Sequence, residues 1–286
     1  MILDIIYPRL AHIGENNTVK RILPFRTKRS LGPFCFLDHM GPVAMADNSS
    51  ADVLSHPHIG LETVTYLFEG QLFHRDSLGT RQIIQSGDVN WMTAGKGIAH
   101  SERSIYSKES SRLHGLQAWI ALPKQHEDCD PRFVHYSADV LPVFDDEGTE
   151  AKIIVGHFLN YRSPVKTYFE TIYVYVKMLK SACFSFFNQY EELGLYLIDG
   201  EIKIDNKVFN ESALIVLQPK IEIKIEANTN ARYVIIGGQK LPEPRFMFWN
   251  FVSTDKSKIE KAKNDWKSGY FAKVIDETTT VPLPEE

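Results

Sequence analysis

The stretch that decides the fold runs from residue 56 to residue 102. It begins HPHIGLETVTYLFEG (56–70) and ends SGDVNWMTAGKGIAHSE (86–102). The β-branched and aromatic runs at 63–68 and 89–92 are bounded by turn signals that contain glycine, as is typical of short strands. Similar runs, such as 116–122, recur along most of the chain. Many short strands separated by turns predict an all-β protein of the barrel or sandwich class.

Two pairs of side chains in this stretch have the spacing of metal ligands. His56 and His58 are two residues apart, and so are His100 and Glu102. Since side chains on a strand alternate between its two faces, the members of each pair point the same way. Three imidazoles and one carboxylate in octahedral coordination leave positions for a substrate and O2, which suits iron. We predict one mononuclear divalent metal, with Fe2+ favoured and Mn, Co, Ni, Cu and Zn left open.

An internal repeat indicates that the fold occurs twice. TYLFEG at 65–70 resembles LYLIDG at 195–200, an offset of 130 residues, and the apolar run 213–217 stands where 88–92 stands in the first half. At the same offset His56 and His58 become Phe186 and Asn188, and nothing like His100 and Glu102 follows residue 213. We therefore expect two copies of one β-fold, with metal ligands in the first copy only.

The chain is expected to divide near residue 140, because the stretch from Pro123 to Gly156 is polar and rich in turn residues. We predict an N-terminal metal-binding barrel at 1–140, and a C-terminal barrel without metal ligands at 141–286 that includes a terminal helix. Thr254 is expected to cap that helix, which would run to about Gly269. Its apolar stripe would pack on a barrel and consists of Ile259, Ala262, Trp266 and Tyr270.

Composition excludes several classes of function. A net charge of −4 over 286 residues argues against direct nucleic-acid binding, which usually needs a basic stripe. No apolar run approaches the roughly 20 residues of a membrane span, and the N-terminus has no signal-peptide pattern. The cysteines are sparse and contain no CxxC pair: Cys35, Cys129 and Cys183. They fit a reducing compartment, so we expect a cytoplasmic protein.

Three blocks of the chain, 34–42, 56–66 and 87–102, resemble the pirin family of the cupin superfamily. The likeness continues at 113–117, 119–123, 243–245 and 265–269. The resemblance implies a bicupin, an all-β protein of two cupin-type β-barrels with a C-terminal α-helix. By the family pattern, the metal ligands are His56, His58, His100 and Glu102.

The chain departs from related patterns at two points. The general cupin pattern would take its carboxylate from Glu62, which is the alternative to Glu102. Ile59-Gly60-Leu61 stands where many pirins have Arg-Gly-Phe. A positive charge and an aromatic ring are missing here, so contacts that depend on them do not transfer to this chain.

Two classes of function agree with the resemblance. The first is a quercetinase-type flavonol dioxygenase that uses the metal and O2, with Glu102 as the catalytic base. The alternative is a redox-sensitive, metal-dependent regulatory protein, either a transcription cofactor or a modulator of a metabolic enzyme, that acts through contacts with a partner protein. A flat flavonol would need an apolar mouth, for which the candidates are Phe34, Phe36, Phe68, Phe73 and Met92, although such residues also form barrel cores.

The other histidines are assigned structural roles. His39 and His114 lie in blocks that resemble the family and could hydrogen-bond to a ligand histidine. The remaining five have no partner at ligand spacing: His12, His74, His126, His135 and His157.

Overall fold

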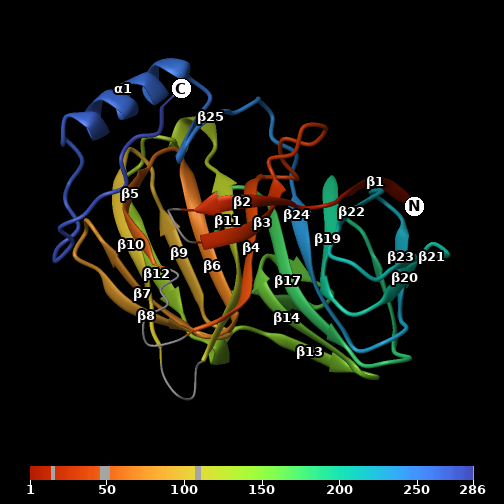
Figure 1. Cartoon of the computed structure of the whole chain (residues 1–286). Coiled ribbons are helices and arrows are strands. Elements are labelled where there is room, and N and C mark those ends of the chain that lie inside the picture. Colours follow the sequence, from red (N-terminus) through yellow and green to blue (C-terminus); the bar gives the residue numbers. More distant parts are fainter. Residues whose placement is uncertain (14–16, 46–51, 107–110, 286) are drawn as a thin grey trace. The chain divides into compact units, whose positions relative to one another are not determined.

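Strands make up nearly all the regular structure of this chain. The structure, a computed structural model, describes residues 1–13, 17–45, 52–106 and 111–285. Within these ranges the single α-helix lies near the C-terminus (Figure 1), so the predicted all-β class with a terminal helix is confirmed. The described chain forms two compact units. The first barrel contains Leu10–Arg21, Phe36–Ala138 and Pro242–Glu286, and the second barrel contains Met1–Arg9, Ile22–Cys35 and Asp139–Leu241.

The first barrel is built from a seven-stranded sheet in the order β12-β9-β6-β11-β4-β3-β2 and a four-stranded sheet in the order β5-β10-β7-β8. Its segments also include the hairpin β25-β26 and the helix α1. The bounds of these elements are β2 (Arg9–Ile13), β3 (Asn17–Leu23), β4 (Phe34–Ala44), β5 (Val53–His58), β6 (Leu61–Glu69), β7 (Gln71–Asp76), β8 (Arg81–Gln85), β9 (Val89–Thr93), β10 (Ile98–Ser104), β11 (Arg112–Ala121), β12 (Arg132–Tyr136), β25 (Phe246–Phe248), β26 (Phe251–Ser253) and α1 (Lys256–Lys267).

The second barrel repeats this plan, with sheets in the orders β1-β22-β19-β24-β17-β14-β13 and β18-β23-β20-β21 and a short hairpin β15-β16. The bounds are β1 (Ile2–Ile6), β13 (Val143–Asp146), β14 (Thr149–Val155), β15 (His157–Phe158), β16 (Tyr161–Arg162), β17 (Thr171–Met178), β18 (Cys183–Phe187), β19 (Glu192–Asp199), β20 (Ile202–Ile204), β21 (Lys207–Phe209), β22 (Leu214–Leu217), β23 (Glu222–Ala227) and β24 (Ala231–Gly238).

The strand orders support the predicted duplication. The two copies of the sequence repeat lie in β6 and β19, and these strands have equivalent neighbours: β9 and β11 flank β6, and β22 and β24 flank β19. In the same way β5-β10-β7-β8 corresponds to β18-β23-β20-β21. The equivalence aligns the two barrels strand by strand, so the contents of their interiors can be compared position by position.

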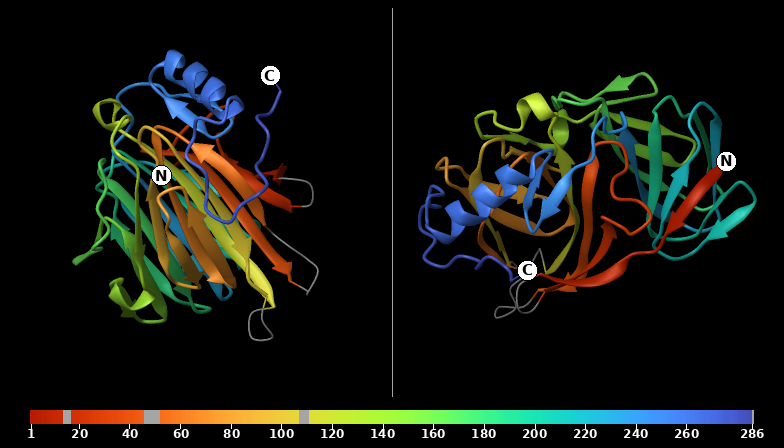
Figure 2. Two further views of the ribbon diagram at one scale, coloured as in Figure 1. Left: turned by 90° about the vertical axis from the view of Figure 1, so that its left-hand side faces the viewer. Right: turned by 90° about the horizontal axis from the view of Figure 1, so that it is seen from above.

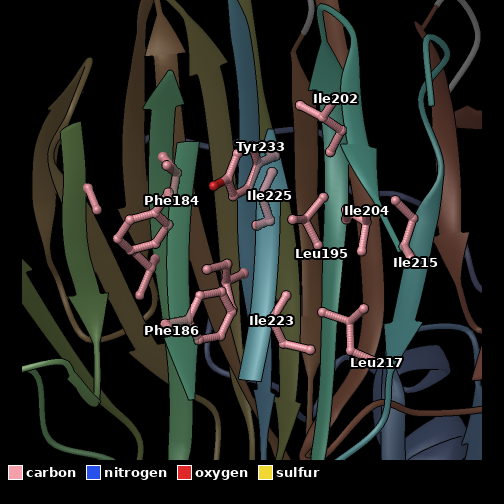
Figure 3. Close-up of a cluster of buried hydrophobic side chains, with 14 of the residues drawn as sticks. Phe184, Phe186, Leu195, Ile202, Ile204, Ile215, Leu217, Ile223, Ile225 and Tyr233 are labelled. Atoms are coloured by element: carbon pink, nitrogen blue, oxygen red, sulfur yellow. The ribbon is translucent and has the colours of Figure 1, made fainter. Parts of the chain in front are cut away.

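The second barrel has an apolar interior where the first has the predicted ligands. His56 lies opposite His100 in the β5–β10 pair, and Phe186 lies opposite Ile223 in the β18–β23 pair. Phe186, Ile223 and Ile225 belong to one buried hydrophobic cluster, together with Leu195 and Tyr233 (Figure 3). The alternating burial along β18 and β23 places these side chains inside and their neighbours in solvent.

The predicted division placed residues 1–140 in one barrel and 141–286 in the other. In the structure, two terminal segments belong to the opposite compact unit from the one predicted. Residues 1–9 join the second barrel because β1 pairs with β22 as an outer strand of its sheet. The terminal segment joins the first barrel because α1 packs on β25 and β26, and Ile259 and Ala262 form an apolar cluster with Ile59 and Phe251. Figure 2 shows this helix and the tail that follows it from two further directions.

The helix begins and ends inside its predicted bounds. Asp255, not Thr254, is the N-cap: its carboxylate accepts a hydrogen bond from the backbone N–H of Ser257 at 2.8 Å. The helix ends at Lys267, and Tyr270 is 80% exposed, so including Tyr270 in the apolar stripe was wrong. Ile259 and Ala262 are buried as expected.

We predict that Leu195→Ala lowers the free energy of unfolding by about 3 kcal/mol, because the lost methyl groups leave a cavity in the second barrel's core. The matched control is Leu179→Ala in the same barrel, where the side chain is 61% exposed and the expected change is under about 0.5 kcal/mol. Urea unfolding of the full chain measures both values. Equal effects of the two substitutions would contradict the assignment of this core.

Candidate metal centre

Two paired strands of the first barrel carry the predicted ligand residues. β5 supplies His56 and His58, and β10 supplies His100 and Glu102. The turn from β5 into β6 passes through Gly60, whose φ is +69°. A Cβ on this residue would lie 1.9 Å from the Val252 carbonyl oxygen, so only glycine fits there. The tight turn fixes where the end of β5, and therefore His58, lies in the barrel.

Three of the predicted ligands meet inside the barrel. One ring nitrogen from each of His56, His58 and His100 lies within 4.8 Å of the other two, and all three side chains are buried. Nε2 of His58 and Nε2 of His100 are 3.1 Å apart. Two nitrogens at neighbouring positions, each about 2.1 Å from one metal, are separated by roughly 3 Å. The donor set and this spacing fit a divalent transition metal.

Hydrogen bonds outside the cluster fix which ring nitrogens carry protons. Nδ1 of His56 is 2.7 Å from the Leu54 carbonyl and donates a hydrogen bond to it. The lone pair of Nε2 is therefore available to bind a metal. Nε2 of His74 is 3.0 Å from the Asp76 carboxylate, and Nδ1 of His74 is 3.4 Å from Nδ1 of His100. If His74 donates to Asp76, its Nδ1 accepts from His100, and the Nε2 lone pair of His100 faces His58.

His74 was assigned a structural role from the sequence, and the structure places it beside the site. His74 and Asp76 are buried on the inner face of β7, where Asp76 is paired with His100 and His74 with Glu102. The available signal was the His-x-Asp spacing on a strand. That spacing puts His74 and Asp76 on the same face of the strand, and this face is the one that also presents His100 and Glu102 of β10.

Burial keeps the three clustered imidazoles uncharged near neutral pH. It lowers the pKa of His56 to about 4, with the Leu54 carbonyl opposing the shift and His74 adding to it. Burial also places the pKa values of His58 and His100 well below their ordinary range, and the neighbouring histidines lower them further. Neutral imidazoles are the form that binds a metal, so the site does not have to release protons first.

Glu102 lies outside the three-histidine group but on the same interior. Its Oε1 is 2.9 Å from the Thr65 hydroxyl, which is also 2.8 Å from Oε1 of Gln117. One hydroxyl hydrogen serves one acceptor, so turning over the Gln117 amide gives a consistent chain in which Gln117 donates to Thr65 and Thr65 donates to Glu102. Burial raises the pKa of Glu102, while His74 and Thr65 oppose the shift.

Glu62, the alternative carboxylate, lies on the other face of its strand. It is three residues before Thr65 on β6, so its side chain points away from the interior that contains Glu102. Its Oε1 accepts hydrogen bonds from Trp91 Nε1 and Thr93 Oγ1, both at 2.8 Å. Burial raises the pKa of Glu62 to about 7 even though Trp91 and Thr93 lower it.

Aromatic side chains form one wall beside the histidines. Trp119 meets the His58 ring edge-on with centroids 5.2 Å apart, and Phe36 stacks on Trp119 at 3.9 Å. Of the other aromatic candidates, Phe34 belongs to the second barrel and packs there against Tyr173, and Phe68 packs against His114. Phe73 lies under the guanidinium of Arg75. The wall therefore consists of Phe36, which was a candidate, and Trp119, which was not.

The remaining histidines have other neighbours. His39 and His114 are buried and bond to each other, with Nε2 atoms 2.8 Å apart. Nδ1 of His135 is 2.7 Å from the side-chain oxygen of Asn90, and His12 is near the Thr18 hydroxyl at 3.3 Å. The predicted hydrogen bond from His39 or His114 to a ligand histidine stays a prediction.

Comparisons with known proteins place this chain in one family. The Pirin family matches residues 16–120, and the Pirin C-terminal cupin domain matches residues 173–272. A "Pirin-like protein" of Caulobacter vibrioides is 39% identical, covering 99% of this chain and all of that protein. A Pseudomonas aeruginosa protein named "Putative quercetin 2,3-dioxygenase PA1205" is 33% identical over 94% of this chain and 84% of its own length.

Solved structures agree with the sequence matches. The crystal structure of a quercetin 2,3-dioxygenase from Acinetobacter baumannii superposes with a TM-score of 0.93. It is 34% identical and covers 100% of this chain and 96% of its own. Among the described residues, no helix combines the length and the apolar character needed to span a bilayer.

We predict that His58→Ala reduces bound metal from about one ion per chain to near zero, since it removes a central member of the cluster. His126→Ala is the control, because His126 is half-buried in a short 3-10 turn, Lys124–His126, outside the cluster. Metal content after loading and desalting is measured by plasma emission spectroscopy. Full retention of metal in His58→Ala would contradict the ligand assignment.

We predict that Glu62→Gln leaves the metal content unchanged but flattens the pH dependence of stability. Between pH 4.5, the ordinary value, and about 7, the folded chain holds a proton at Glu62 that the unfolded chain has released. The unfolding free energy should therefore fall as the pH rises through this window, by about 3 kcal/mol at most, and level off above it.

Glutamine suits this test because it keeps the oxygen that accepts from Trp91 and Thr93. The measurement is urea unfolding of both proteins at several pH values from 5 to about 8. Subtracting the two profiles cancels the contributions of the histidines. Parallel profiles would show that Glu62 does not titrate differently in the two states, and loss of metal would restore Glu62 as a ligand.

Proposed function

Since this chain belongs to the pirin family, we propose that it is a metal-dependent dioxygenase of the quercetinase type, acting on a flavonol and O2. The observation that carries the proposal is the buried cluster of His56, His58 and His100, with Glu102 on the same interior. Support for the substrate class comes from the names of the Pseudomonas aeruginosa and Acinetobacter baumannii relatives.

The proposed ligands are His56, His58, His100 and Glu102, and the proposed metal is Fe2+. Once bound, Fe2+ would supply Lewis acidity and one-electron redox chemistry. The chain contributes a buried site. The Leu54 carbonyl orients His56, the Asp76–His74 pair orients His100, and burial keeps the imidazoles neutral.

We assign the proton-transfer step to Glu102. In this step the carboxylate removes the proton of a flavonol hydroxyl, so the bound substrate becomes an anion and Glu102 becomes a neutral acid. Burial raises the pKa of Glu102 in the metal-free protein, so a Glu102 carboxylate that has left the metal would be a stronger base than one in water. The Thr65 hydroxyl donates to Oε1 of Glu102, which leaves Oε2 for the metal or, once Glu102 has left the metal, for the proton of the substrate.

The wall formed by Phe36 and Trp119 supports a flat aromatic substrate. The two rings stack in parallel, at an angle of 13°, beside His58, and the Arg21 guanidinium lies over the outer ring at 4.6 Å. A flavonol is proposed to lie against the edge of this stack, because Arg21 already covers the outer face of Phe36. A cytoplasmic location is part of the proposal and rests on the sparse, widely spaced cysteines.

We predict that protein loaded anaerobically with Fe2+ consumes O2 when a flavonol is added. Metal-free protein and His58→Ala should consume O2 only at the background rate, because they lack the complete site. Glu102→Gln should lower kcat by about a hundredfold, as expected for the loss of a general base. An oxygen electrode with a panel of flavonols measures all four proteins, and His126→Ala serves as the positive control.

Uptake that requires both Fe2+ and His58 is the expected outcome. Tight Fe2+ binding with no uptake for any flavonol would contradict the oxygenase proposal. It would favour the regulatory alternative, in which the metal's oxidation state controls binding to a partner protein.

A further inference from the structure

The outer face of the ligand-bearing sheet has a second cluster of charge, separate from the metal centre. Because side chains alternate along β10, His100 and Glu102 point inward while Ser101 and Arg103 point outward. On β7, His74 and Asp76 point inward and Arg75 points outward, next to Arg81 of β8. The four-stranded sheet thus has the candidate ligands on one face and three arginines on the other.

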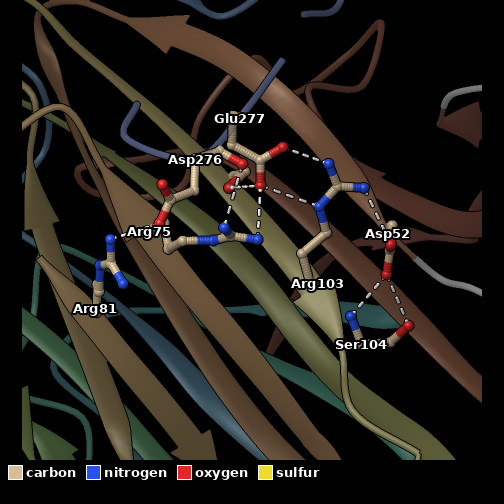
Figure 4. A network of polar contacts seen from close by, with 8 residues as sticks. Asp52, Arg75, Arg81, Arg103, Ser104, Asp276 and Glu277 are labelled. Atoms are coloured by element: carbon tan, nitrogen blue, oxygen red, sulfur yellow. Dashed lines mark hydrogen bonds and ion pairs between the residues drawn. The ribbon is translucent and has the colours of Figure 1, made fainter. Parts of the chain in front are cut away.

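A segment from the end of the chain binds this outer face. The Glu277 carboxylate accepts from the Ser101 hydroxyl at 2.9 Å, from Arg103 through Nε at 3.1 Å and through Nη2, and pairs with Arg75 at 3.0 Å (Figure 4). Its side chain is only 3% exposed. Asp276 pairs with Arg81 at 2.5 Å.

The same segment also pairs with the edge of the sheet. Thr280 forms a parallel bridge with Ser55, and the Val281 N–H donates to the Ser55 carbonyl at 2.8 Å. Ser55 immediately precedes His56. Arg103 adds a further link, because its Nη1 donates to Asp52 at 3.1 Å, just before β5 begins. Residues 276–281, which we name the clasp, therefore contact both strands that carry the candidate ligands.

We propose that the clasp positions the metal ligands, with Glu277 as the positioning residue that fixes β10 and β5 relative to each other from outside the barrel. This inference rests on the proposed metal site. Three anchors of the clasp are directly next to candidate ligands: Ser101 lies between His100 and Glu102, Arg103 follows Glu102, and Ser55 precedes His56. Because only one peptide bond separates each of these anchors from a ligand, a displacement of the anchor also displaces the ligand.

The strength of the anchor comes from its low exposure. Two arginines and a hydroxyl surround a nearly buried carboxylate, and charge-assisted bonds of this kind are stronger than neutral ones. Burial raises the pKa of Glu277, but the bonds from Arg103 and Ser101 and the nearby charges outweigh it, so the pKa is lowered overall. Losing the charge would leave Arg103 and Arg75 with less compensation.

The test measures Co2+ affinity and the visible absorption spectrum of bound Co2+ for the full-length protein. Glu277→Gln keeps the shape of the side chain and removes its charge. It should weaken Co2+ binding about tenfold and shift the spectrum, because losing a contact that orients the ligands lowers metal affinity. Ser101→Ala removes one hydrogen bond from the same carboxylate. It should weaken Co2+ binding about threefold, which is a smaller effect of the same kind as that of Glu277→Gln.

Asp128→Asn is the matched control. Asp128 pairs with Lys258 at 2.7 Å and so also links the terminal segment to the barrel, but it touches neither β5 nor β10. It should leave both the affinity and the spectrum unchanged. Tm is recorded for every metal-free protein, so that a general loss of stability is separated from an effect on the site.

Wild-type affinity and spectrum in both Glu277→Gln and Ser101→Ala, whatever their Tm, would overturn the proposal and leave the clasp a stabilising contact only. If Glu277→Gln does not fold, Ser101→Ala decides alone. An equal loss of affinity in Asp128→Asn would also overturn the proposal. Failure of the wild-type protein to bind Co2+ would be a different result, because it would remove the proposed metal site itself.

Discussion

The candidate site depends on the antiparallel pairing of β5 with β10, which sets His56 opposite His100. Strand pairing allows only discrete registers, and a slip of one residue would turn every side chain to the other face. In the observed register, the candidate ligands and the His74–Asp76 pair all point inward, while serines and arginines point outward. One set of backbone hydrogen bonds thus determines both the metal centre and the surface to which the clasp binds.

The two barrels show what the same architecture becomes with and without polar interior residues. In the second barrel, Phe186, Ile223 and Ile225 occupy positions equivalent to candidate ligands and belong to a continuous apolar core. Hydrophobic burial is the main stabilising contribution in that interior. The first barrel gives up part of this stabilisation, because it buries imidazoles and carboxylates that would be better solvated in water. Hydrogen bonds donated to the Leu54 carbonyl and the Asp76 carboxylate, and donated by the Thr65 hydroxyl, offset part of that cost.

The sequence predicted the parts of this molecule that depend on local pattern. Period-two spacing identified two pairs of metal-capable side chains, His56 with His58 and His100 with Glu102, and the offset of 130 residues identified the second barrel and its lack of ligands. It did not predict His74, because its partner His100 lies on another strand and the pairing of β7 with β10 cannot be read from either segment alone. For the same reason Glu277, which contacts residues more than 170 positions away, had no sequence signal.

The exchange of terminal segments has a consequence for biosynthesis. Residues 1–9, which precede the other strands, complete the sheet of the second barrel, whereas residues 242–286, which follow those strands, belong to the first barrel. While the chain is still being translated, β5 and β10 can pair, but Ser55, Ser101 and Arg103 have no clasp to bind. The barrel that contains the three histidines is therefore begun early and completed only after residues 276–281 have left the ribosome. If the clasp positions the ligands as proposed, pairing of β5 with β10 comes before completion of the metal site during synthesis.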